Sequence, residues 1–103
     1  MSAPATRERA AHLLCEIHCR LDALGEVHDG SVVWPMTQTD LGNALGMSVV
    51  HVNRTLKELR QSGLIALDRG VLRIPDLAAL MYAGDFDAGY LHMRTAAERA
   101  MMV

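Results

Sequence analysis

Apolar residues recur every three or four positions near the start of the chain, and this spacing indicates an amphipathic helix. The apolar stripe runs through residues 6–24 and consists of Ala10, Leu13, Leu14, Ile17, Leu21 and Leu24. Thr6 is a suitable N-cap for this helix, and Gly25 is a suitable residue to end it. The pattern therefore predicts one long helix over 6–24.

Two helices with clear start and stop signals follow in the middle of the chain. Thr37, with Asp40 three residues later, predicts the start of a short helix, and Gly46 predicts its end. Ser48 is suited to cap a longer amphipathic helix over about 48–62. The two helices are therefore separated only by a tight turn.

Shorter apolar runs on either side of these helices are interrupted by turn residues, which predicts hairpins. The first covers 26–34 and turns at a His-Asp-Gly sequence, and the second covers 64–74 and turns at Asp-Arg-Gly. Asp76 is suited to cap a last short helix. Residues 84–103 form a C-terminal tail that is helix-prone toward its end and receives no firm assignment.

The order of these elements predicts a mainly α-helical fold with small β hairpins, a winged helix-turn-helix over 6–83. Gly42 is small enough to let the two central helices approach, and Gly46 tolerates the positive φ of their turn. The expected core consists of Leu13, Ile17, Leu41, Leu45, Val52, Leu56, Leu59 and Ile65, and Trp34 is expected in the core rather than as a stacking platform. The aromatic residues Tyr82, Phe86 and Tyr90 are expected in a packed C-terminal segment because they are spaced four apart.

The outward face of the predicted 48–62 helix carries the side chains that matter for function. At 100° per residue this face collects Val50, Asn53, Arg54, Lys57 and Gln61. In a helix-turn-helix the corresponding face enters the major groove of DNA. Arg54 can donate to guanine O6 and N7, Asn53 suits adenine or a phosphate, and Val50 can contact a thymine methyl. Lys57 and Gln61 lie further along and are better placed for phosphates.

The charge of the chain first argues against nucleic acid, because its 103 residues carry a formal net charge of −2. The distribution changes this picture. Residues 37–74 carry a net charge of +2, which leaves −4 for the remainder. Positive charge is therefore concentrated on the predicted helix-turn-helix and wing, where a DNA contact requires it.

Several classes of protein are not supported by the sequence. No apolar run approaches the 18 residues of a membrane span, and the N-terminus has no apolar signal core, so a cytoplasmic protein with no membrane partner is expected. Two cysteines are too few for a disulfide framework. The chain shows no glycine-rich phosphate loop, no paired carboxylates and no nucleophile with a base, so we expect neither an enzyme nor a cofactor in this domain.

His12, Cys15 and Cys19 form a separate cluster on the first predicted helix, on the face opposite the apolar stripe. Thiolates and imidazoles are ligands for zinc or copper, and thiols can be oxidised. One helix supplies only three such ligands, however, so the favoured interpretation is that this face packs against another domain or a partner. A metal or redox role is the weaker alternative.

The stretch TQTDLGNALGMSVVHVNRTLKELRQSGLIALDRGVLRI, preceded by ERAAHLLCEIHCRL and HDGSVVWPMT, resembles the C-terminal DNA-binding domain of the Crp/Fnr (cyclic-AMP receptor protein / fumarate-nitrate regulator) family. The resemblance covers about residues 7–80. It implies a bacterial transcription regulator that binds palindromic double-stranded DNA as a homodimer, with RNA polymerase as a further partner. An effector would bind a sensor domain that this stretch does not include, so the chain is either a domain of a longer protein or a stand-alone regulator.

Carried over position by position, the resemblance implies that Arg54 pairs with guanine and that Asn53 and Lys57 touch bases or backbone. The sequence departs from the family at Val49 and Val50, where well-known members have a charged base reader. The predicted base contacts are Val49, Val50, Asn53 and Arg54, and the predicted phosphate contacts are Thr37, Ser48, His51, Lys57, Gln61 and Arg69. The alternative function is a winged helix for protein–protein contact or dimerisation without DNA.

Overall fold

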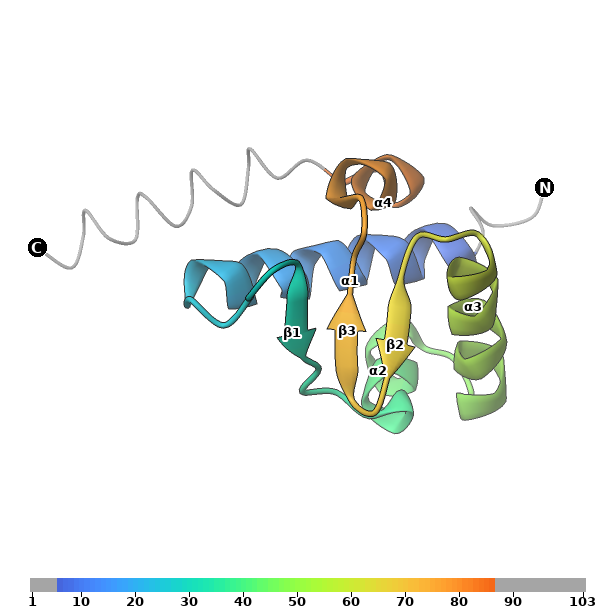
Figure 1. Ribbon diagram of the computed structural model, residues 1–103. Helices are drawn as coiled ribbons and strands as arrows, with labels where there is room; N and C mark the ends of the chain where they lie inside the picture. Colours follow the sequence, from blue (N-terminus) through green and yellow to red (C-terminus); the bar gives the residue numbers. More distant parts are fainter. Residues whose placement is uncertain (1–5, 87–103) are drawn as a thin grey trace, which may run out of the picture.

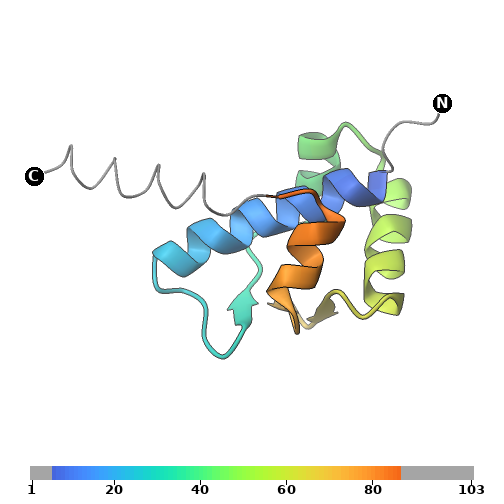
Figure 2. The ribbon, with the colours of Figure 1, turned by 90° about the horizontal axis from the view of Figure 1, so that it is seen from above.

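The computed structural model describes residues 6–86, and it shows a winged helix-turn-helix. The elements are α1 (Thr6–Ala23), β1 (Ser31–Val33), α2 (Gln38–Leu45), α3 (Val49–Gln61), β2 (Ala66–Asp68), β3 (Val71–Arg73) and α4 (Leu77–Ala83). In Figure 1, α1 crosses the molecule lengthwise, the sheet and the α2–α3 pair lie on one side of it, and α4 lies on the other. Figure 2, seen from above, shows α4 crossing α1.

The predicted helices are confirmed, and so are most of their boundaries. Thr6 is itself helical, so the predicted cap at this residue is wrong. Gly25 follows α1 at φ +77, and the backbone N–H of Glu26 donates to the carbonyl of Leu21 at 2.9 Å, which closes the end of the helix. Gly63 ends α3 in the same way at φ +75. Asp76 caps α4 by accepting a hydrogen bond from Ala79 N at 3.2 Å.

The first predicted hairpin forms only in part. Asp29 and Gly30 make a tight turn with positive φ, and His28 and Ser31 exchange backbone hydrogen bonds of 2.8 and 2.9 Å. The residues before the turn cannot continue as a strand, because Glu26 N–H is held by the end of α1. The returning strand β1 therefore pairs with β3 rather than with a strand of its own hairpin.

The second hairpin is confirmed and forms the wing. Together with β1, the β2–β3 hairpin forms a three-stranded antiparallel sheet of order β1-β3-β2, with Val32 opposite Leu72 and Val33 opposite Val71. Alternation along the strands turns Val32 and Leu72 toward the core, where both are buried. Val33 and Val71 point to the other face, and Val33 is 76% exposed.

The core differs from the prediction mainly along α1. The buried residues of this helix are Ala10, Ala11, Leu14, Cys15 and His18, so its buried face shares Ala10 and Leu14 with the predicted stripe but is rotated toward Cys15 and His18. Leu13 and Ile17 are only half-buried and Leu24 is exposed, because α3 and α4 pack against the other side of the helix. The remaining predicted core residues are buried: Leu41, Leu45, Val52, Leu56, Leu59 and Ile65.

The aromatic residues have different positions. Trp34, predicted to lie in the core, is only half-buried and packs against it. Tyr82 is 92% exposed, so its predicted packing is wrong. Phe86 contacts His12 with a ring-centre distance of 5.0 Å and an interplanar angle of 80°. Tyr90 lies outside the described residues. Within residues 6–86 no helix is both long and apolar enough to cross a membrane.

Candidate nucleic-acid interface

The helix-turn-helix begins with a complete capping box at the start of α2. The Thr37 hydroxyl accepts a hydrogen bond from Asp40 N at 3.0 Å, and the Asp40 carboxylate accepts one from Thr37 N at 2.9 Å. These two bonds satisfy backbone donors that the first turn of a helix leaves unpaired. The start of α2 is therefore fixed by the first and last side chains of the motif TQTD.

The turn between α2 and α3 depends on two glycines. Gly46 has φ +68 and ψ +34, a left-handed conformation that L side chains rarely adopt. It lets the chain reverse so that Met47 N–H donates to Gly42 O at 2.8 Å. A Cβ on Gly42 would lie 2.6 Å from Met47 O and 3.6 Å from Val52 Cγ2. Only glycine at position 42 therefore lets the turn and α3 rest directly on α2.

Helix α3 is fixed from its start and along its inner face. The Ser48 hydroxyl accepts from His51 N at 3.1 Å and caps the helix. The buried face consists of Val52, Thr55, Leu56 and Leu59. Thr55 is a buried polar residue that the apolar pattern did not predict, and its hydroxyl donates to His51 O at 2.9 Å, so its burial leaves no hydrogen bond unmade.

The opposite face of α3 is exposed and carries the predicted DNA-contacting side chains. Val49 is 44% and Val50 is 70% exposed, and the exposed polar residues beside them are Asn53, Arg54, Lys57 and Gln61. Within residues 6–86 the one ion pair joins Arg20 to Glu16 at 3.4 Å, so Arg54 and Lys57 are not neutralised by any described carboxylate. The structure therefore brings this set together on one open surface.

The wing adds positive charge at the same end of the molecule. Its turn is made by Arg69 at φ +53 and Gly70 at φ +77, the two left-handed residues of a tight hairpin turn. Arg69 is exposed at the tip, and Arg73 is exposed on β3. Figure 1 shows that this turn and the first turn of α3 both lie at the end of the molecule away from α1. One approaching surface can therefore meet both.

Two arginines that the sequence pattern did not single out join α1 to the helix-turn-helix. Arg9 donates to the carbonyl of Leu45, at the end of α2, over 2.7 Å. Arg7 donates to the Ser62 hydroxyl, just after α3, over 2.9 Å. Charge on an amphipathic helix gives no signal of such long-range partners, so only the tertiary structure reveals them.

His12, Cys15 and Cys19 do not form the predicted cluster on a face of α1 away from the core. Cys15 is fully buried in the core, and burial, assisted by the neighbouring Cys19, raises the pKa of its thiol to about 12. Cys19 is half-buried, and its pKa is also raised, mainly by burial and further by Asp22. Over the described stretch no three His, Cys, Asp or Glu side chains are grouped so that they could hold a metal ion.

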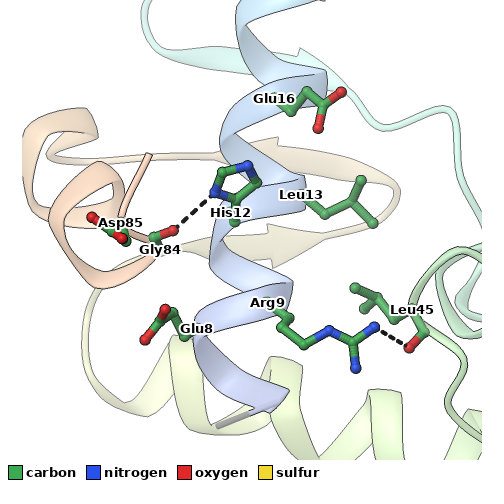
Figure 3. A pocket seen from close by; sticks show the side chains of 8 residues that line it. All are labelled: Glu8, Arg9, His12, Leu13, Glu16, Leu45, Gly84 and Asp85. Atoms are coloured by element: carbon green, nitrogen blue, oxygen red, sulfur yellow. Dashed lines mark hydrogen bonds between the residues drawn. The ribbon is translucent and has the colours of Figure 1, made fainter. Parts of the chain in front are cut away.

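His12 instead helps to close a cleft of about 360 Å³ between α1, the end of α2 and the corner after α4. Its Nδ1 lies 3.0 Å from the carbonyl oxygen of Gly84 (Figure 3). Gly84 packs so tightly that a Cβ there would lie 2.5 Å from His12 N. Glu8 and Glu16 line the cleft two turns of α1 apart, about 12 Å along the axis, which is too far to act together on one atom. The polar groups here hold elements together.

Comparison with known proteins identifies the family. The profile described as a Crp-like helix-turn-helix domain matches residues 8–83, about three quarters of the chain. The chain belongs to this family. It is thus a DNA-binding domain of the transcription-regulator type, and the resemblance to Crp/Fnr regulators is confirmed. No curated protein matches the sequence.

Solved structures of Crp-family regulators have the same fold. FixK2 from Bradyrhizobium japonicum superposes with a TM-score of 0.65 at 25% identity, over 77% of this chain and 38% of that protein. A CRP-family transcriptional regulator from Thermus thermophilus, TTHB099, gives 0.62 at 25% identity, over 79% and 40%. Reduced CprK, at 17% identity and a TM-score of 0.62 over 81% and 39%, shows the likeness of fold alone. The Crp-like chain spans about two fifths of the length of each regulator.

Proposed function

We propose that this domain binds specific double-stranded DNA sequences with α3 in the major groove. The observation that carries the proposal is the open face of α3, where exposed Arg54 and Lys57 have no described carboxylate partner. A free guanidinium in the recognition helix can donate twice to guanine O6 and N7. The proposed base contacts are those of the first half of the helix: Val49, Val50, Asn53 and Arg54.

Phosphate contacts would hold the helix in register on the duplex. Thr37 and Ser48 support this role, because each hydroxyl accepts a backbone hydrogen bond and keeps its own proton free to donate to a phosphate oxygen. Both residues start helices, whose N-termini favour anions. Further contacts are proposed along α3 and at the wing tip: His51, Lys57, Gln61 and Arg69. These contacts add affinity that falls as salt rises.

The proposal extends to the assembled regulator. Two copies in a homodimer would read two half-sites of a palindrome about 34 Å apart. RNA polymerase is the further partner that we propose for such a regulator, and any effector would act through a sensor domain outside this chain. A single copy would contact one half-site and would bind weakly on its own.

The test is selection of bound duplexes from a random DNA pool, followed by titration of variants on the selected and on a random duplex. Arg54→Ala is expected to cost about 1–3 kcal/mol on the selected duplex and to relax discrimination at one base pair. Lys57→Ala is expected to weaken binding to both duplexes equally, and to reduce the slope of log affinity against log salt concentration by about one. Arg20→Ala is the matched control, because it removes an exposed arginine on α1 and alters net charge equally.

The outcomes distinguish the two candidate functions. If Arg54→Ala behaved like Arg20→Ala, base readout through Arg54 would be wrong. If no duplex were retained even at low salt, the alternative function of protein–protein contact would be favoured.

A further inference from the structure

The first turn of α3 presents an apolar surface in the middle of a polar face. Val50 is 70% exposed and Val49 is 44% exposed, although the residues that follow on this face are polar. Ser48 caps the helix directly before them and keeps this turn helical. The first turn of α3, which the proposed function places against base edges, therefore offers methyl groups and no side-chain donor or acceptor on this face.

Val50 lies beside Arg54 on the helix surface. The two residues are four apart in α3, and such pairs have Cβ atoms about 5–6 Å apart on one face. Neighbouring base pairs are stacked about 3.4 Å apart. If Arg54 reads a guanine, Val50 therefore meets a base pair one or two steps away in the same groove.

The edge of that base pair decides whether contact with Val50 is favourable. The major groove carries one apolar group, the C5 methyl of thymine, whereas cytosine presents its N4 amino donor without a methyl. A valine buries the methyl favourably, and it can pair with neither the O4 acceptor of thymine nor the N4 donor of cytosine, so the methyl alone favours thymine over cytosine. Cytosine methylated at C5 carries the same methyl at the same position as thymine.

We propose that Val50 is a specificity residue that reads a C5 methyl group close to the guanine contacted by Arg54. The target then contains thymine at that position, and 5-methylcytosine substitutes for it better than cytosine does. The inference rests on the proposed placement of α3 in the major groove.

The experiment uses the duplex enriched from the random pool and replaces each thymine in turn by deoxyuridine. This change removes the methyl and leaves base pairing intact. With the parent domain, one position close to the guanine that depends on Arg54 is expected to lose about fourfold in affinity, which corresponds to one buried methyl. Replacing that pair by cytosine·guanine is expected to lose at least as much, and 5-methylcytosine is expected to recover the part due to the methyl, about fourfold.

Two variants assign the effect to a side chain. Val50→Ala is expected to bring the thymine-to-uracil ratio at that position close to one, and to remove the gain from 5-methylcytosine. Val33→Ala is the matched control, since it truncates an equally exposed valine on β1 and should keep both effects. Thermal unfolding of both variants confirms that the fold is retained.

The possible results separate a failure of methyl reading by Val50 from a failure of the proposed function. If a target is enriched and depends on Arg54, but every uracil duplex binds like the parent duplex, methyl reading is overturned and the proposed function stands. A uracil effect that persists undiminished in Val50→Ala also overturns the role of this residue. If no sequence is enriched at all, base reading and methyl reading fall together.

Discussion

Replacing Gly42 with alanine tests whether close contact between α2 and the turn holds the recognition helix in place. The new Cβ would lie 2.6 Å from Met47 O, whereas ordinary contacts begin near 3.4 Å, so the carbonyl must move by about 0.8 Å. That movement strains the 2.8 Å hydrogen bond from Met47 N to Gly42 O. The turn that orients α3 is thus forced away from α2.

The expected cost follows from opposing terms. Forcing a methyl into a packed site costs about 1–3 kcal/mol, and a weakened hydrogen bond adds about 0.5–1.5 kcal/mol. Alanine in a helix interior returns about 1 kcal/mol relative to glycine. The free energy of unfolding should therefore fall by about 2 kcal/mol, which lowers Tm by about 8–16 °C in a domain of this size.

The assay is thermal and urea unfolding followed by circular dichroism, together with DNA titration. Asn43→Ala is the matched control, because Asn43 is the next residue of α2 and is exposed. It gains helix propensity without a clash and should unfold at the same temperature as the parent or slightly higher. If Gly42→Ala were as stable as the parent and bound DNA equally well, the packing argument for Gly42 would be refuted.

Three further predictions follow from the capping box, the buried histidine and the two thiols. Thr37→Ala removes the side-chain acceptor at the start of α2 and should lower the free energy of unfolding by about 1 kcal/mol in urea melts, whereas Thr39→Ala, on the exposed surface of the same helix, should change it little. Burial lowers the pKa of His18 from its usual 6.5, against a smaller upward effect of Asp22, so on acidification the unfolded chain binds a proton at His18 before the folded chain does. The free energy of unfolding should therefore be at its full value above pH 6.5 and fall as the pH drops below 6.5. In urea melts, His18→Leu should show a weaker pH dependence of this free energy over the same range. In a thiol-labelling assay Cys19 should react in the folded protein, and Cys15 should react only after unfolding, because Cys15 is fully buried and the pKa of its thiol is raised to about 12. Equal labelling rates of the two thiols in the folded protein would contradict the buried position of Cys15.

The central motif could be predicted from the sequence because its signals are local. Thr37, Gly46 and Ser48 each act within one turn of their own position, through a cap or a positive φ, and all three are confirmed. The exposed face of α3 also followed from spacing alone, since one strong apolar stripe of this helix leaves only one side for the core.

The other features of the fold depend on contacts between residues that are far apart in the sequence. The first helix has apolar residues on more than one side, so spacing could not show that Cys15 rather than Leu13 faces the core. The pairing of β1 was set by a strand far along the chain. The links from Arg7 and Arg9 to the helix-turn-helix are equally distant in sequence. Which bases the valines and Arg54 contact stays a prediction.

The pairing of β1 with β3 has a consequence for cooperativity. Val33 lies opposite Val71, so the strand pair closes a loop that contains α2, α3 and β2. Such a long closure is favourable only once the enclosed elements have formed. Fluctuations that open the recognition helix should therefore also release the wing, and the two should exchange their amide hydrogens as one unit. A ligand held by α3 would then protect amides in β1, which it never touches.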